Sequence, residues 1–244
     1  MSARKYILVV EDDADLADSI RFNLEREGYR TIHAGDGSAA LAAIRRETPD
    51  LILLDRMLPI VSGDEVVIAL RRDPRTPRIP VIVLSAKSDE TDELVGFALG
   101  VDDYVRKPFS IKSLIARVAA VMRRHAGTDP GTSPVSQGGF SVDTQRHELL
   151  VHGIRVALTS TELRVLRALI SAQGSVLSRS ELINAAIGLG AAITDRTIDV
   201  HILAIRKKIK SALPDANAEN WIHTVRGVGY SFRRPAEMPV VPSE

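Results

Sequence analysis

The stretch KYILVVEDD, residues 5–13, decides the fold of the first half of the chain. Five apolar residues in a row, Tyr6–Val10, are followed at once by three acids. A continuous apolar run of this length is typical of a strand that is buried on both faces. Two similar runs follow, Leu51–Leu54 and Val81–Leu84. The three runs predict the centre of a parallel sheet that is covered by helices on each side.

Apolar residues at helical spacing fill the intervals between these runs. Leu16, Ile20 and Leu24 recur every four residues, and Leu41 with Ile44 repeats the pattern more briefly. Residues 32–34 and 104–105 are shorter candidates for further strands. Strands that alternate with helices in this way predict an α/β domain with a parallel sheet.

A segment rich in Gly, Pro, Ser and Thr, residues 127–139, predicts a flexible linker. We therefore expect a first domain over residues 1–125, a linker over 126–138, a second domain over 139–235 and a tail over 236–244. In the second domain, short strands near 140–142, 148–151 and 155–158 precede helices over 162–172, 179–186 and 196–212. A β-hairpin over 221–232 closes this α+β domain.

The amino-acid composition excludes several classes of functional site. The 244 residues include no cysteine, which excludes disulfide scaffolds, thiolate metal sites and cysteine catalysis and fits a cytoplasmic protein. No apolar stretch approaches the roughly 18 residues of a membrane helix, and the first apolar run is too short for a signal peptide. The net charge is only +1, but residues 195–234 hold eight basic and four acidic side chains. This local excess indicates an anionic partner for the second domain.

A polar residue follows each long apolar run of the first domain. Because the carboxyl ends of parallel strands meet at one edge of a sheet, these side chains are expected to converge there. They are the carboxylates of Glu11, Asp12 and Asp55, the hydroxyl of Ser85 and, after residues 104–105, the ammonium of Lys107. Carboxylates this close repel one another unless a hard cation such as Mg²⁺ neutralises them. Each acid alone could instead cap a helix, but capping explains neither Asp55 nor the lysine.

This series, with Tyr104 and the sequence Lys107-Pro108-Phe109, resembles the receiver domain of response regulators over residues 5–124. The resemblance implies a doubly wound, flavodoxin-like sheet with strand order 2-1-3-4-5. It also implies that a histidine kinase transfers a phosphoryl group to Asp55. The Mg²⁺ ligands that it implies are Glu11, Asp12, Asp55 and the backbone carbonyl of Met57. The implied switch residues are Lys107, which would pair with the phosphate, Ser85, which would donate a hydrogen bond to it, and Tyr104, which would turn inward.

The expected helix over 196–212 combines an apolar stripe with a basic surface. Its isoleucines recur at helical spacing and should face the core. Val200, Leu203 and Ala204 lie off this stripe, where water would otherwise be, and such a patch favours a partner. A solvated amphipathic helix is the alternative interpretation. In the hairpin, Arg226 stands at the tip beside Gly227, which suits a phosphate or a minor groove.

The segments 158–163, 174–179, 196–202, 206–208 and 224–230 resemble the winged-helix effector of OmpR/PhoB-type response regulators, a resemblance that covers residues 140–234. In that family the long helix enters the major groove and the wing reaches the neighbouring minor groove. The DNA contacts that the resemblance implies are Arg196, Thr197, His201, Arg206, Lys207, Thr224 and Arg226. The apolar side chains Val200, Leu203 and Ala204 are added as candidates for contact with thymine methyl groups. Residues 188–194, which meet RNA polymerase in the family, lack its usual aromatic.

Members of this family dimerise through the fourth helix, fifth strand and fifth helix of their receivers. Two of the inter-subunit ion pairs of that surface are matched in this chain, Asp103–Arg117 and Asp102–Arg124. The third is not, because Glu93 stands where a basic residue is usual and Ser113 where an acid is. The resemblance implies a homodimer that forms on phosphorylation but lacks one ion pair.

The sequence thus predicts a phosphorylation-dependent transcriptional regulator of a two-component system rather than an enzyme. Its expected partners are a histidine kinase, duplex DNA, RNA polymerase and a second copy of the chain. One alternative is a Mg²⁺-dependent phosphohydrolase with Asp55 as nucleophile, although no second acid or substrate loop is evident. Another is a receiver that regulates only a protein partner. A DNA-shift assay beside a phosphatase assay separates these functions.

Overall fold

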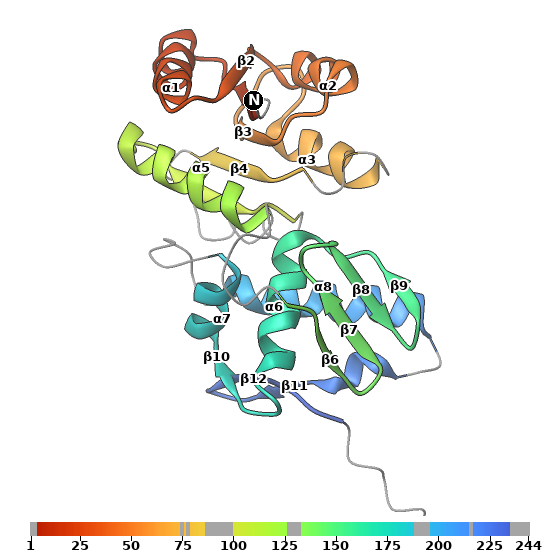
Figure 1. The fold of residues 1–244 in the computed structure, drawn as a ribbon. Helices are drawn as coiled ribbons and strands as arrows, with labels where there is room; N and C mark the ends of the chain where they lie inside the picture. The colour runs from red at the N-terminus through yellow and green to blue at the C-terminus, as the bar shows by residue number, and fades with distance from the viewer. Residues whose placement is uncertain are drawn as a thin grey trace, which may run out of the picture.

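A computed structural model of the chain describes residues 4–73, 76, 79–85, 100–125, 133–187, 196–214 and 217–234. They form two lobes, the N-terminal one above the C-terminal one in Figure 1. The first is built on a five-stranded parallel sheet of order β2-β1-β3-β4-β5. This order confirms the predicted doubly wound fold. Its strands are β1 (Tyr6–Val10), β2 (Arg30–Ala34), β3 (Leu51–Asp55), β4 (Val81–Ser85) and β5 (Asp103–Arg106).

Helices cover both faces of this sheet. On one face α1 (Ala14–Arg26) and α5 (Ile111–His125) share an apolar core with the strands. On the other, α2 (Gly37–Arg46) and α3 (Gly63–Arg72) do the same. Every residue of β1, β3 and β4 is buried, and all are apolar except Asp55 and Ser85 at the strand ends, as expected for strands covered on both faces. The expected fourth helix falls within residues 86–99, which lie outside the described residues.

The C-terminal lobe begins with a four-stranded antiparallel sheet of order β6-β7-β8-β9. Its strands are β6 (Val135–Gln137), β7 (Phe140–Asp143), β8 (Glu148–Val151) and β9 (Ile154–Val156). The predicted linker therefore extended too far, because residues 135–137 pair with β7 as an edge strand. Their sequence is short and polar, and hydrogen bonding to β7, rather than an apolar pattern of their own, defines the strand.

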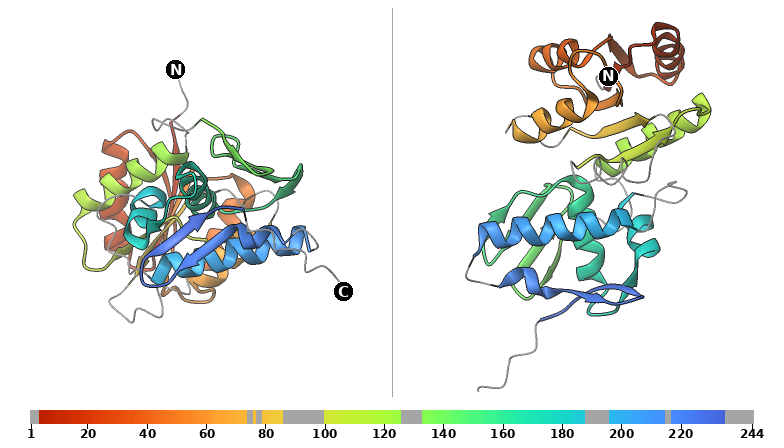
Figure 2. Two further views of the ribbon diagram at one scale, coloured as in Figure 1. Left: turned by 90° about the horizontal axis from the view of Figure 1, so that it is seen from below. Right: turned by 180° about the vertical axis from the view of Figure 1, so that it is seen from behind.

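Three helices and a hairpin complete this lobe. The helices are α6 (Ser160–Ser171), α7 (Arg179–Ala186) and α8 (Arg196–Ala212). A short 3₁₀ helix, η1 (Ala218–Trp221), leads into the hairpin of β11 (Ile222–Val225) and β12 (Gly229–Phe232), and β10 (Leu177–Ser178) pairs with β12. The rings of Phe140, Trp221 and Phe232 pack together and join the hairpin to the four-stranded sheet of the same lobe. Seen from behind, α8 crosses the lobe beneath the receiver sheet (Figure 2).

The two lobes touch through described residues. The ring centroids of His125, at the end of α5, and His147, in the turn before β8, are 5.3 Å apart. A Cβ atom added to Gly100 would lie 2.5 Å from Cγ2 of Thr159, so the receiver backbone abuts the start of α6 there. Among the described residues, no helix has the length and apolar character needed to cross a membrane.

Candidate phosphoacceptor site and DNA-binding surface

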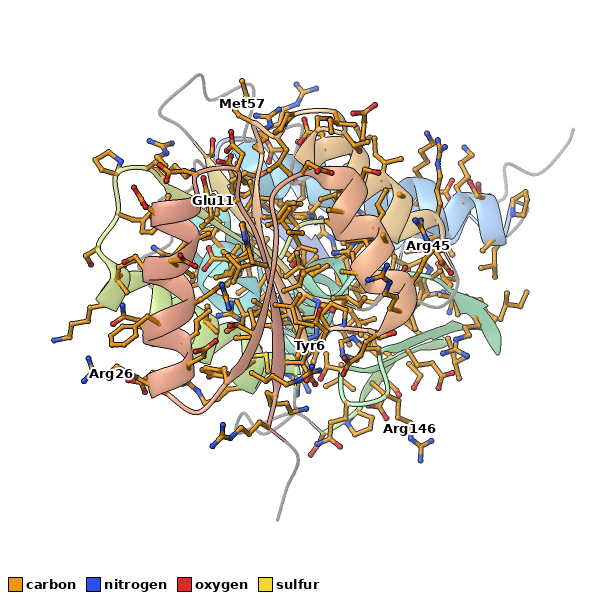
Figure 3. All side chains as sticks on the ribbon, turned by 90° about the horizontal axis from the view of Figure 1, so that it is seen from above. Tyr6, Glu11, Arg26, Arg45, Met57 and Arg146 are labelled. Atoms are coloured by element: carbon orange, nitrogen blue, oxygen red, sulfur yellow. The ribbon has the colours of Figure 1, made fainter. Side chains whose placement is uncertain are left out.

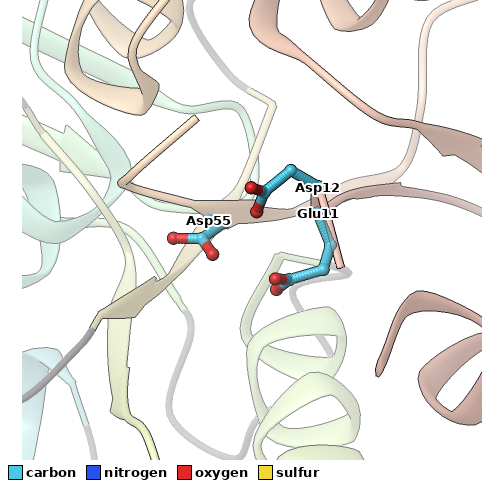
Figure 4. A group of neighbouring side chains, drawn as sticks. All are labelled: Glu11, Asp12 and Asp55. Atoms are coloured by element: carbon cyan, nitrogen blue, oxygen red, sulfur yellow. The ribbon is translucent and has the colours of Figure 1, made fainter. Parts of the chain in front are cut away.

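The acidic residues of the receiver converge at the carboxyl edge of its sheet, as the sequence predicts. Asp55 is the last residue of β3 and is 5% exposed, while Glu11 follows β1 and is 1% exposed. Asp12 is exposed. One carboxylate oxygen of each lies within 4.8 Å of the others, and Figure 4 shows the three side chains pointing toward one another. Oxygen donors in this arrangement are the ligands that Mg²⁺ prefers.

The ammonium group of Lys107 lies between two of these carboxylates. Its Nζ donates to Oδ2 of Asp55 at 2.6 Å and to both oxygens of Glu11 at 2.8 Å. Burial raises the pKa of Glu11 to about 7, the bond from Lys107 opposes this rise and the charge of Asp55 adds to it. Three carboxylates and one ammonium group meet here, and such a cluster favours a further cation.

The backbone after Asp55 forms a closed loop at this edge. The Met57 amide donates to Oδ1 of Asp55 at 2.9 Å, and the Met57 side chain is 73% exposed. In Figure 3, Met57 and Glu11 lie toward one end of the sheet and Tyr6 toward the other. The amide of Gly63 donates to the carbonyl of Arg56, and a Cβ on Gly63 would lie only 2.5 Å from the carbonyl oxygen of Asp55. Only glycine lets α3 begin so close to the phosphoacceptor candidate.

The switch candidates lie on the two neighbouring strands. Ser85 ends β4, is 5% exposed, and its carbonyl accepts a hydrogen bond of 2.7 Å from the Lys107 amide. Tyr104 lies in β5 and is only 4% exposed. Its ring therefore lies inside in this structure, and the inward turn of Tyr104 on phosphorylation stays a prediction.

Asp13, the third acid of the triplet, does not join this group. Its side chain accepts a hydrogen bond of 3.1 Å from the amide of Leu16 and caps α1. Helix capping is thus the correct interpretation for this one acid, while its two neighbours belong to the site.

In the second lobe, hydrogen bonds tie α8 to the hairpin. The hydroxyl of Tyr230 donates to Asp199 at 2.7 Å. Arg206 donates to the carbonyl of Ile222 at 2.6 Å and to Oγ1 of Thr224 at 3.0 Å. Arg206, predicted as a DNA contact, therefore holds the wing against the helix in this structure.

Several predicted contacts form an exposed surface on α8 and the hairpin tip. Leu203 is 67% exposed, Lys207 is exposed, and Val200 and Ala204 are half-buried. They line a groove of about 680 Å³ between α8 and β9. Thr224 and Arg226 are exposed on the hairpin. Helix and hairpin thus present apolar and basic groups together.

Two of the predicted DNA contacts need correction. Thr197 and His201 have no exposed surface in this structure. Burial lowers the pKa of His201 to about 4, so its ring is neutral at pH 7 and offers no charge to a phosphate. Helical spacing put both residues beside the apolar stripe, and that position was the available signal that they face inward. The side chain of Arg196 lies outside the described residues.

The predicted dimer residues have partners within the chain. Arg117 donates to both carboxylate oxygens of Asp103, at 3.2 and 3.1 Å. Asp102 lies 3.1 Å from His125 Nε2 and 3.6 Å from Nη2 atoms of Arg71 and Arg164. Sequence reasoning missed these three partners, since they come from distant parts of the chain. Glu93 lies outside the described residues, and Ser113 is exposed.

Comparisons with known proteins agree with both halves of this architecture. The family model of the response regulator receiver domain matches residues 7–119, and that of the transcriptional regulatory protein, C terminal, matches residues 153–232. The phosphate regulon transcriptional regulatory protein PhoB of Pseudomonas aeruginosa is 39% identical, with 93% of this chain and 97% of the relative covered. The sensory transduction protein RegX3 of Mycobacterium tuberculosis is 40% identical, with 93% and 98% covered.

A solved structure resembles the whole chain. It is the structure of a RitR mutant, with a TM-score of 0.73 and 27% sequence identity, and the match covers 95% of this chain and all of that one. Receiver domains bind Mg²⁺ at an acidic pocket of the kind formed by Glu11, Asp12 and Asp55. The homologues are transcriptional response regulators and not enzymes, which removes the phosphohydrolase alternative. The chain therefore belongs to the OmpR/PhoB-type response regulators, the phosphorylation-dependent transcription factors of two-component systems.

Proposed function

We propose that Asp55 accepts a phosphoryl group from the phosphohistidine of a sensor kinase. The observation that carries this proposal is the buried carboxylate of Asp55, which is bonded to Lys107 and lies beside Glu11 and Asp12. A carboxylate oxygen of Asp55 forms the new bond to phosphorus while the bond from phosphorus to the imidazole nitrogen breaks, and the electron pair stays on that nitrogen. Such a transfer needs positioning and charge neutralisation more than covalent machinery.

The residues of the site fit a Mg²⁺ ion. Glu11, Asp12, Asp55 and the backbone carbonyl of Met57 would hold it, because one oxygen from each of the three carboxylates lies within 4.8 Å of the others. When bound, Mg²⁺ neutralises these carboxylates and the phosphoryl oxygens. Lys107 moves its hydrogen bond from Asp55 to the new phosphate, and the Ser85 hydroxyl donates to it. Tyr104 packs inward behind Ser85 in the phosphorylated state.

The proposed output of this switch is dimerisation. The domain division that we infer ends the receiver at His125, with α5, and begins the effector at Val135, with β6. Phosphorylation then favours a receiver dimer in which Asp103 binds Arg117 and Asp102 binds Arg124 between subunits. Two tethered effector domains gain affinity for tandem DNA sites through their raised effective concentration.

DNA binding is proposed for the surface formed by α8 and the wing. The exposed Leu203 and Lys207 would enter the major groove with Val200 and Ala204, and Thr224 and Arg226 would reach the backbone and minor groove. As a transcription regulator the protein would act in the cytoplasm and meet RNA polymerase. Residues 188–194, which are expected to make that contact, lie outside the described residues.

Selection of duplex DNA from random sequence by the phosphorylated protein tests this proposal. We expect tandem half-sites rich in thymine, because the exposed apolar side chains on α8 contact thymine methyl groups rather than the hydrogen-bonding edge of guanine. The variant Leu203→Arg should bring guanine into the same positions. A wild-type consensus dominated by guanine there would contradict the proposed reading of DNA, and no enrichment at all would contradict DNA binding.

Replacing Arg226 by alanine should weaken DNA binding by about 1–3 kcal/mol and relax the preference for A·T pairs at the flanking step. The exposed guanidinium at the wing tip is suited to a narrow, strongly negative minor groove. Titration of labelled duplexes with A·T or G·C flanks measures both effects. Arg233→Ala removes the same charge from another exposed arginine in the lobe and is the matched control. Equal losses in the two variants would show that Arg226 contributes only general charge.

A further inference from the structure

The groove between α8 and β9 in the effector lobe combines apolar walls with cations. Its volume of about 680 Å³ is within the range of ligand pockets in proteins. The apolar residues that line it are Val156, Ala157, Val200, Leu203, Ala204 and Ala212. Leu203 is 67% exposed, so a large apolar side chain faces water when the groove is empty. Such a surface favours an apolar occupant.

The charged groups of the groove restrict what this occupant is. Arg155 on β9 and Lys207 on α8 are exposed, and Lys208 is bound to Glu162 at 2.6 Å. The side chain of Arg155 is 58% exposed and makes only a long contact of 3.6 Å with Glu148. Among the described residues that line the groove, none is an acid. The occupant that fits is therefore an apolar segment that carries negative charge.

A segment with these properties follows β12 in the same chain. Residues 235–244 have the sequence PAEMPVVPSE, which includes the apolar side chains of Met238, Val240 and Val241. The segment has two glutamates and no basic residue. Its three prolines favour an extended backbone, the conformation that suits a groove. Residues 235–244 lie outside the described residues.

The residues before this segment bring its start close to the end of α8. The Arg233 amide donates to the Trp221 carbonyl at 3.0 Å, so the chain leaves β12 beside η1. Helix η1 packs against α8, and Lys210 on α8 lies 3.5 Å from Glu219 on η1. Seen from behind, η1 and the hairpin lie below α8 (Figure 2). The segment therefore begins near the last turn of α8.

The groove begins at that same turn and follows the helix. From Ala212 back to Val200 the helix rises about 18 Å, and ten extended residues span about 33 Å. We propose that residues 235–244 dock in the groove of their own chain. Their valines then contact the apolar walls, and their glutamates lie toward Arg155 and Lys207.

Docking of this segment and binding of DNA exclude each other. Leu203 and Lys207 belong both to the groove and to the proposed DNA-reading surface. This consequence rests on the proposed function, whereas docking itself does not. A tethered segment acts at an effective concentration of about 1 mM. If it binds the groove with a submillimolar dissociation constant, it lowers the apparent affinity for DNA severalfold.

The first test needs neither DNA nor a phosphodonor. In the full-length protein, the double change Val240→Asp and Val241→Asp should shift the methyl NMR signals of Leu203 and Ala204, because the docked valines are lost. Ser243→Asp adds a charge to the same segment without removing an apolar group and is the matched control. It should leave the methyl signals as in wild type. Unchanged signals in the double variant would overturn docking.

A synthetic peptide of residues 235–244 tests the same contact from outside. Added to the double variant at millimolar concentration, it should return the methyl signals toward their wild-type positions. Signals that do not respond to the peptide would assign the groove to another occupant and overturn the proposal. The shifts between wild type and the double variant should not depend on protein concentration. Shifts that grow with it would mean that the segment of a second copy fills the groove, which also contradicts docking within one chain.

DNA titration tests the competition. Without phosphodonor, the double variant should bind duplex DNA about threefold to tenfold more tightly than wild type, and Ser243→Asp should bind as wild type does. Equal affinity of the double variant and wild type would refute the competition. Absence of DNA binding in every variant would instead be failure of the proposed function, and the methyl signals would still show whether the segment docks.

Discussion

The variant Asp55→Ala is expected to incorporate no phosphoryl group from a small phosphodonor such as acetyl phosphate. Asp55 ends the central strand β3 and accepts a hydrogen bond of 2.6 Å from Lys107, and alanine removes the proposed nucleophile itself. The measurement is labelling of the purified protein in the presence of Mg²⁺, followed by mass determination. Labelling at the wild-type level in this variant would refute the site.

The matched control for this experiment is Asp13→Ala, which removes a neighbouring acid from the same edge of the sheet. Asp13 caps α1 and stands outside the acidic cluster, so substantial labelling should remain. Loss of the cap should instead lower the free energy of unfolding by about 0.5–2 kcal/mol. A thermal unfolding curve measured beside the labelling separates the two effects.

Reversal of charge by Arg117→Glu should prevent dimerisation while phosphorylation proceeds. Asp103 is 2% exposed, so solvent screens its charge little. In the proposed symmetric dimer, reversal turns two attractions to Asp103 into repulsions. Arg117 lies on α5, while the acidic cluster lies at the carboxyl edge of the sheet, so labelling should be preserved. Sedimentation with and without phosphodonor measures the mass.

Lys112→Glu makes the same change of charge at an exposed position of the same helix and serves as the control. It should dimerise on phosphorylation as wild type does. If Arg117→Glu dimerised equally well, the ion pairs of this surface would not support the dimer. A wild-type protein that stayed monomeric in both states, even at high concentration, would refute phosphorylation-driven dimerisation altogether.

Much of the receiver could be predicted because its central strands are buried on both faces. The runs 6–10, 51–54 and 81–84 match β1, β3 and β4 to within one residue. The polar residue at each end then identifies the site, since topology alone brings those ends together. By contrast, β2 begins two residues before its predicted start, because Arg30 at its beginning is exposed and breaks the apolar pattern. An edge strand is less buried than a central one, so its apolar pattern in the sequence is weaker.

The effector shows where such reasoning stops. Helix α8 spans the predicted residues 196–212, and the hairpin follows as expected. Helical spacing placed Thr197 and His201 beside the apolar stripe but did not fix how far they are buried, because both residue types occur on solvated surfaces and in protein interiors. Nor could it show that Arg164 reaches Asp102, as contacts between separate lobes leave no local periodicity. Contacts between residues far apart in the sequence depend on how the elements pack in three dimensions.

The absence of a side chain at Gly63 has a mechanical consequence. With the Gly63 amide bonded to the Arg56 carbonyl and no space for a Cβ beside Asp55, the loop from 55 to 63 is a short backbone ring clamped at both ends. We therefore expect helix α3 and strand β3 to move together. If Asp55 carries a phosphoryl group as proposed, the displacement that this group imposes should be directed across the sheet toward β4 and β5, the strands on the side away from α3's start.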